Sequence, residues 1–177
     1  MAGWILAAAL LLPVSPGWTA ALPVPAGQEQ PAGDEEDDTP RDGMPVTADT
    51  ERKIRSFLDR FVDADKTPEE QAEMFTERAE YYEHGYVGRD DILRDVERYV
   101  RHWPTRHYEV DRIDFMSADP HSDRIFVSYT IDFEVARGAQ IVRGKASYGA
   151  VIRDIAGDPK VESIKEKVQA RRSGSNE

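Results

Sequence analysis

The chain has 177 residues, no cysteine and a formal net charge of −11. The lack of cysteine excludes disulfides, a thiol nucleophile and thiolate metal sites. About half of the charge lies in residues 28–42, where seven acidic residues face one arginine. The rest of the chain is mildly acidic and its basic residues are scattered, so neither nucleic acid nor an anionic membrane is an expected partner.

Residues 1–21 contain a short apolar run, Trp4 to Leu12, followed by proline, glycine and small residues. This order predicts a secretory signal peptide that is cleaved near Ala21. The alternative is a retained anchor, but the run is shorter than the roughly 20 apolar residues that a membrane-spanning helix needs. We therefore expect an exported protein, periplasmic or secreted, without stable membrane insertion.

Residues 22–46 are rich in proline, glycine, aspartate and glutamate. Such a segment buries too little apolar surface to offset its ordering entropy, which predicts a disordered acidic linker. Its acidic run is typical of a solvated spacer, with calcium or a basic partner as the alternative ligand. Residues 171–177 are polar and are expected to form a flexible tail. One domain is therefore expected over residues 47–170.

Three helices are expected at the start of this domain. The first, residues 47–63, repeats apolar side chains at the spacing of a helix with one buried face. A short second helix follows Thr67, because Pro68 suits a first helical position and Glu70 completes a capping box. The third helix, residues 89–102, also has one apolar face and ends before a proline.

Strands are expected before and after the third helix. The predicted ranges are residues 79–83, 106–116, 124–136, 140–153 and 161–168. Apolar and polar residues alternate strictly in the range 124–136, which is typical of a strand with one buried face. A break in alternation near Arg112 indicates a bulge. The order predicts an α+β fold, in which a cone-shaped, curved antiparallel sheet wraps around three N-terminal helices and leaves a hollow inside.

Short motifs accompany this order of elements. They are Phe75-x-x-x-Ala79-x-Tyr81-Tyr82, Gly88-Arg89-Asp90-Asp91-Ile92, and Tyr99 with Trp103-Pro104-x-Arg106-x-Tyr108. With them, residues 47–169 resemble the nuclear transport factor 2-like superfamily, in an exported bacterial subgroup. That superfamily includes steroid isomerases, scytalone dehydratase, SnoaL-like polyketide cyclases and many domains without known activity. The resemblance implies the cone fold and leaves the function open.

The resemblance places the carboxylate base of the isomerases near Glu83. On an extended strand Tyr81 and Glu83 share one face, and if that face lines the hollow, Glu83 is a candidate general base. His84 is the second candidate acid or base. Tyr129 or Tyr148 would then donate a hydrogen bond to a developing enolate. The alternative is an exposed carboxylate and an exposed histidine beside a glycine turn.

Aromatic side chains and one arginine are expected to line a pocket in the hollow. These residues are Tyr81, Tyr82, Tyr99, Trp103, Arg106, Tyr129 and Tyr148. The simpler alternative is an aromatic core between helix and sheet. Arg106 is expected to pair with a carboxylate of the preceding helix or to contact Tyr82, whereas at a pocket mouth it would hold an anionic ligand bidentately. No pair of the four histidines has the spacing of a zinc site, so no metal and no cofactor is expected.

These observations favour an exported, non-enzymatic domain that binds a small apolar or anionic ligand in the cone, or a protein partner on the sheet. Homodimerisation is expected through the flat, polar sheet face that carries Ser128, Thr130, Arg143 and Lys145. Two alternatives stay open. One is a cone-pocket enzyme of the isomerase, dehydratase or cyclase type with Glu83 or His84 as general base. The other is an envelope or stress-related assembly factor.

Overall fold

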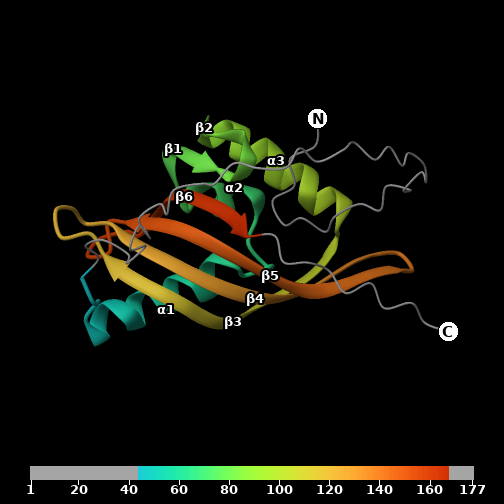
Figure 1. The fold of residues 1–177 in the computed structure, drawn as a ribbon. Helices are drawn as coiled ribbons and strands as arrows, with labels where there is room; N and C mark the ends of the chain where they lie inside the picture. Colours follow the sequence, from blue (N-terminus) through green and yellow to red (C-terminus); the bar gives the residue numbers. More distant parts are fainter. Residues whose placement is uncertain (1–43, 168–177) are drawn as a thin grey trace, which may run out of the picture. The chain divides into compact units, whose positions relative to one another are not determined.

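A curved six-stranded sheet packs against three helices in the computed structural model, which describes residues 44–167 (Figure 1). The helices are α1 (Ala48–Phe61), α2 (Pro68–Glu73) and α3 (Arg89–His102). The strands are β1 (Phe75–Tyr81), β2 (Tyr86–Gly88), β3 (Thr105–Ala118), β4 (Ile125–Arg137), β5 (Gln140–Arg153) and β6 (Lys160–Lys167). The predicted fold class is confirmed. The predicted signal peptide, the tail and almost all of the predicted linker lie outside the described residues.

The strands follow the order β2-β1-β6-β5-β4-β3 across the sheet. The pairs β3–β4, β4–β5 and β5–β6 are antiparallel, as expected for consecutive strands with short turns. β1 and β6 are parallel, with Tyr81 opposite Ile164, which differs from the expected all-antiparallel sheet. The reason is the long connection between them: a chain that passes through α3 and three long strands can return to β1 in either direction.

The first two helices begin at the residues that the sequence indicates. The Thr47 side chain accepts a hydrogen bond from the backbone N–H of Thr50 at the start of α1. At α2, Thr67 Oγ1 accepts from the Glu70 backbone N–H, and the Glu70 carboxylate accepts from the Thr67 N–H at 2.8 Å. The predicted capping box is therefore confirmed, and it fixes the turn between α1 and β1.

The core lies between the helices and the alternating side chains of the long strands. Ile54, Phe57 and Leu58 on α1 are buried against Tyr129 and Ile131 on β4 and their neighbours. Burial of this apolar stripe is the main stabilising term, at about 25 cal/mol for each Å² removed from water.

Two irregularities curve β3 against β4. The register shifts between Val110 and Arg112, which confirms the bulge predicted near Arg112, and again between Ile113 and Phe115. A bulge bends its strand and increases the local twist, so the two together help the sheet to curl.

A close contact also joins Phe133 and Gly144, which are cross-strand partners on β4 and β5. A Cβ atom at Gly144 would lie 3.1 Å from the Phe133 ring, closer than ordinary van der Waals contact. Glycine therefore leaves room for the Phe133 ring to lie over β5 at this position.

Candidate functional site

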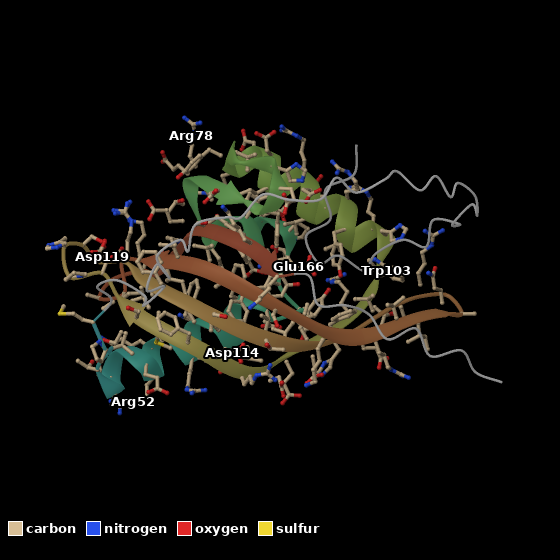
Figure 2. All side chains as sticks on the ribbon, viewed as in Figure 1. Arg52, Arg78, Trp103, Asp114, Asp119 and Glu166 are labelled. Carbon is tan, nitrogen blue, oxygen red and sulfur yellow. The ribbon has the colours of Figure 1, made fainter. Side chains whose placement is uncertain are left out.

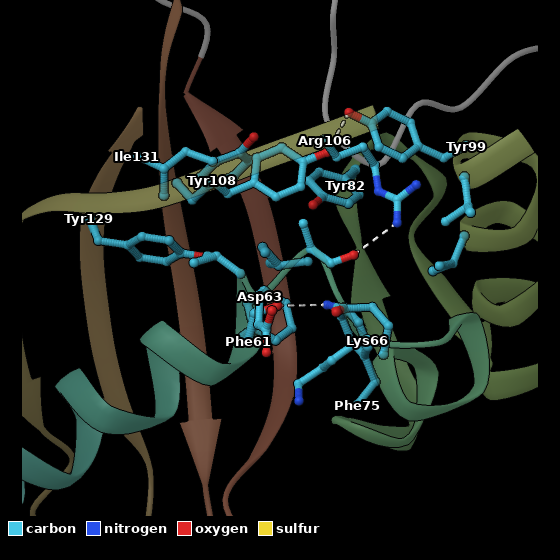
Figure 3. Close-up of a pocket in the computed structure, with 17 residues that line it drawn as sticks. Phe61, Asp63, Lys66, Phe75, Tyr82, Tyr99, Arg106, Tyr108, Tyr129 and Ile131 are labelled. Atoms are coloured by element: carbon cyan, nitrogen blue, oxygen red, sulfur yellow. Dashed lines mark hydrogen bonds between the residues drawn. The ribbon is translucent and has the colours of Figure 1, made fainter. Parts of the chain in front are cut away.

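A cavity of about 70 Å³ lies between the end of α1, the middle of α3 and the sheet (Figure 3). Its wall is mainly apolar, with Asp63, Lys66, Gln71 and Arg106 as the non-tyrosine polar residues. Five tyrosines also contribute to the wall: Tyr82, Tyr99, Tyr108, Tyr129 and Tyr148. The volume exceeds the ~10–15 Å³ that one water occupies on this measure, but it is far below the ~300 Å³ of a drug-sized pocket. The cavity suits a very small molecule or the end of a larger one.

Tyr82 enters this cavity because the chain leaves the strand conformation after Tyr81. Residues Tyr82–His84 form a 3-10 turn, η1, and Tyr82 has a φ of +47°, in the left-handed region that non-glycine residues rarely adopt. The Tyr82 ring packs edge-on against Tyr81, at 4.7 Å between ring centroids, and against Tyr148 at 6.4 Å. This packing offsets the backbone strain, which costs of the order of 1–3 kcal/mol.

The same turn decides where Glu83 and His84 lie. β1 covers Phe75–Tyr81 rather than the predicted 79–83, so the strand alternation that would carry Glu83 into the hollow ends two residues too early. Both Glu83 and His84 are exposed on η1, outside the cavity wall. The His84 ring stacks near Tyr81 at 6.2 Å between centroids.

The structure brings five of the seven predicted pocket residues together and leaves two elsewhere. Tyr81 is buried, and its hydroxyl donates to Asp95 Oδ2 at 3.3 Å, outside the cavity wall. Trp103 packs in a small core cluster with Tyr99 and Val135. The remaining five form part of the cavity wall: Tyr82, Tyr99, Arg106, Tyr129 and Tyr148.

The tyrosine hydroxyls are neutral hydrogen-bonding groups. Burial raises the pKa of Tyr129 and of Tyr148 well above the ordinary value, so both phenols keep their protons at neutral pH. The hydroxyls of Tyr99 and Tyr108 lie 2.9 Å apart and satisfy each other. In contrast, the Tyr148 hydroxyl is buried without a hydrogen-bond partner among residues 44–167.

Arg106 supplies the positive charge of the cavity. Its Nη1 donates to the Trp103 carbonyl and its Nη2 to the Ala64 carbonyl, each at 2.9 Å, so it ties the end of α3 to the segment after α1. The expected pairing with a carboxylate of the preceding helix is not formed. Burial raises the pKa of Tyr99 to about 12, while the hydrogen bond to Tyr108 and then the positive charge of Arg106 oppose that rise.

Glu166 is a site residue that the sequence analysis missed. It is the cross-strand partner of Tyr148 on β6, so both side chains lie on the same face of the sheet. Figure 2 shows Glu166 at the end of β6. After burial, its negative charge is among the causes that raise the pKa of Tyr82, Tyr99 and Tyr148. Only the β5–β6 register could have revealed this position, because the residue stands in a short, highly charged strand.

Two further properties of the described part of the chain concern metal clusters and membrane-spanning helices. Within residues 44–167, no group of three or more histidine, aspartate or glutamate residues is arranged to hold a metal ion. None of the helices in this range has the length and apolar character that crossing a bilayer requires.

No family model matches the sequence, and neither does any curated protein. Solved structures do match. A protein from Catenulispora acidiphila in complex with S-DNPA has a TM-score of 0.55 and 16% identity, over 68% of this chain and 95% of that one. A protein from Novosphingobium aromaticivorans, provisionally assigned as a scytalone dehydratase, has a TM-score of 0.56 and 15% identity, over 74% and 94%. A domain of unknown function with a cystatin-like fold from Nostoc punctiforme has a TM-score of 0.53 and 17% identity, over 71% and 81%.

At these identities the matches establish architecture alone. The curved, unclosed sheet of this chain and its three helices match the overall architecture of those structures at TM-scores of 0.53 to 0.56. The chain therefore has the nuclear transport factor 2-like fold.

Proposed function

We propose that this protein is an exported, non-enzymatic domain that binds a small molecule in the tyrosine-lined cavity. The observation that carries the proposal is the Tyr148 hydroxyl, which is buried without a partner in the described residues. An unsatisfied buried hydroxyl costs about 1–3 kcal/mol, whereas a polar group of a bound molecule would satisfy it. Tyr148 is one of the residues that line the cavity, so a ligand bound there would lie next to its side chain.

Binding is favoured over catalysis because the cavity wall lacks a well-placed base. Glu83 and His84 are exposed on η1, and the acidic residue in the wall, Asp63, is exposed as well. Glu166, beside Tyr148 on β6, is half-buried but lies outside the cavity wall. Neutral phenols with raised pKa values donate hydrogen bonds to a ligand but do not accept a proton at neutral pH. The enzyme alternative with Glu83 or His84 as base would need η1 to turn inward on substrate binding.

Native mass spectrometry of the protein purified from its own host tests this proposal. We expect one small molecule, chemically unchanged, to be retained per chain. The variant Val100→Phe should lose it, because Val100 lies in the cavity wall and the added ring fills the space. Val151→Phe is the matched control, since Val151 lies outside the cavity, on a groove of the other sheet face, and its variant should keep the molecule. An empty wild-type chain, or equal retention by both variants, would contradict the proposal.

Export is the second part of the proposal, and it rests on residues 1–21 of the sequence. Expression in the host followed by mass measurement of the mature chain tests it. A product that begins after Ala21 in the extracytoplasmic fraction supports export. A full-length chain in the cytoplasm would contradict it.

We also propose a homodimer through the outer face of the sheet. Phe115 and Phe126 are 51% and 45% exposed there and line a shallow groove with Gly149 and Val151. Exposed aromatic side chains that line an apolar groove are typical of an interface. Analytical ultracentrifugation should show a dimer for the wild type and a monomer for Phe126→Glu. A monomeric wild type would refute this part.

The proposed interface is the apolar groove beside Phe115 and Phe126, which differs in part from the polar sheet face expected from the sequence. Thr130 is buried, and its hydroxyl lies 2.9 Å from that of Ser147. Arg143 pairs with Glu134, and Lys145 pairs with carboxylates of β3 and β4. These charges are paired within the chain, so they contribute selectivity rather than affinity to an interface.

A further inference from the structure

Arg106 is a cation in the cavity wall without a described counter-ion. No carboxylate of residues 44–167 forms an ion pair with it, and its two hydrogen bonds within this range go to the backbone carbonyls of Trp103 and Ala64. A carbonyl oxygen carries only a partial charge, so the guanidinium keeps most of its attraction for an anion. Two of its five N–H groups are used, which leaves three for a ligand.

The charges near Arg106 reinforce this attraction. Lys66 also lies in the cavity wall and forms no ion pair with the described residues. Asp63 is the acidic residue of the wall; it is exposed, and its Oδ1 accepts a hydrogen bond from the backbone N–H of Asp65 at 3.0 Å. The cavity wall thus holds two cations and one carboxylate, and Glu166, beside Tyr148 on β6, adds a second negative charge outside the wall. The two cations of the wall form no ion pair with the described residues, so an anionic ligand is favoured on the side of the cavity that Arg106 lines.

The rest of the wall selects a ligand with an apolar body. Phe75, Val96 and Ile131 are buried and line the cavity, so they offer apolar surface rather than hydrogen-bond donors. At about 70 Å³ the space accepts only a few heavy atoms. A fully hydrated inorganic anion would lose hydrogen bonds to water on entering the cavity, and the apolar wall would not replace them.

We propose that the cavity binds a short organic carboxylate, whose carboxylate group pairs with Arg106 and whose apolar chain lies against Val96 and Ile131. This inference rests on the proposed binding function and names its ligand class. Arginine suits the role because its planar fork donates two parallel hydrogen bonds to one carboxylate. The bonds to Trp103 and Ala64 hold the guanidinium in place before the ligand arrives, which lowers the entropic cost of binding.

Amide NMR titration of the isotope-labelled chain tests the inference with two probes, sodium butyrate and the neutral isostere butyramide. Butyrate should cause saturable shifts at Arg106, Tyr108 and Ile131, and it should bind about tenfold or more tightly than butyramide, as expected for a charge-assisted pair. Inorganic phosphate should cause no saturable shift at these residues. This comparison uses the unaltered chain, so it does not depend on the folding of any variant.

Two variants of Arg106 and one control variant test whether its guanidinium causes the preference for butyrate over butyramide. Arg106→Gln should lower the butyrate-to-butyramide affinity ratio to about one, because the amide lacks the charge. Arg106→Lys keeps the charge but loses the fork, so its ratio should lie between the two. Arg78→Gln is the control with the same charge change; Arg78 is exposed on β1 (Figure 2) and should leave the ratio unchanged.

The possible outcomes separate the two levels of the proposal. Equal affinity for butyrate and butyramide, or an unchanged ratio in Arg106→Gln, would overturn the carboxylate class and leave cavity binding standing. Tighter binding of phosphate than of butyrate would overturn it too. If the host protein carries no ligand and neither probe shifts a cavity residue, the binding function fails together with its ligand class.

Discussion

Tyr82 packs edge-on against Tyr148 with 6.4 Å between ring centroids, which joins the left-handed turn after β1 to the middle of β5. The contact closes one side of the cavity wall. The Tyr82 backbone is strained, so the packing of its ring must contribute more stabilising free energy than that of an ordinary half-buried tyrosine to keep η1 in place. The left-handed turn at Tyr82 therefore both places a ring in the cavity wall and leaves Glu83 exposed.

Tyr82→Ala is expected to lower the free energy of unfolding by about 3 kcal/mol, because it removes a packed ring and leaves the strained turn. Urea denaturation measures the change. Tyr86→Ala is the matched control: Tyr86 is 66% exposed on β2, and its loss should cost about 0.5 kcal/mol or less. Equal effects of the two substitutions would show that the Tyr82 ring does not hold the turn.

Tyr148→Phe is expected to stabilise the ligand-free chain by about 1 kcal/mol, because it removes a buried hydroxyl that has no partner. Thermal denaturation of the ligand-free protein measures this. Tyr108→Phe is the control and should destabilise the chain. The Tyr108 hydroxyl lies 2.9 Å from that of Tyr99, so its loss leaves the Tyr99 hydroxyl without this hydrogen bond. A destabilised Tyr148→Phe variant would mean that the hydroxyl is satisfied in solution without a ligand.

Gly144→Val is expected to destabilise the fold by about 1–3 kcal/mol, because the new side chain would collide with the Phe133 ring. Gly149→Val, in the same strand, meets nothing within 4 Å and should be neutral or slightly stabilising, since valine favours strands. Urea denaturation of both variants makes the comparison. If both were neutral, the ring of Phe133 would not occupy the space above Gly144.

Acid should weaken the pairing between Arg124 and Glu162, which links the start of β4 to β6. Arg124 holds the Glu162 carboxylate with two hydrogen bonds, and these lower the pKa of Glu162 below its ordinary 4.5. A lowered folded-state pKa gives stability that is present above the unfolded value and is lost as the pH falls through the folded value. Stability from this pair should therefore be intact at neutral pH and should decline as the pH falls below the ordinary value of 4.5 toward the lowered folded-state pKa.

The variant Glu162→Gln tests that pair. Its free energy of unfolding should lie at most about 1 kcal/mol below wild type at pH 7, because both side chains are partly exposed, and the gap should narrow as the pH falls below 4.5. Glu77→Gln is the control, since Glu77 is exposed and forms no ion pair with the described residues. A gap that does not narrow in acid would point to packing rather than charge.

Local features of the sequence predicted most of the fold. The apolar stripe of α1, the capping box at Thr67 and the alternation along β4 each depend on residues close in sequence, and each is present in the structure. The bulge at Arg112 was visible for the same reason. In contrast, the parallel β1–β6 pairing depends on residues more than 80 positions apart, which no local pattern reports.

The candidate site was less predictable because it depends on one backbone angle and one strand register. Strand alternation put Tyr82 and Glu83 on opposite faces, and the left-handed φ of Tyr82 brings its ring inside while Glu83 stays exposed. A tyrosine carries no local signal for that conformation. Likewise, only the β5–β6 register places Glu166 beside Tyr148.

The most direct test of the account is a crystal structure of the full chain grown with sodium butyrate. We expect the carboxylate of butyrate to bind the free N–H groups of Arg106, and its alkyl chain to lie against Val96 and Ile131. A cavity that holds only water, or butyrate bound solely in the groove beside Phe126, would contradict it.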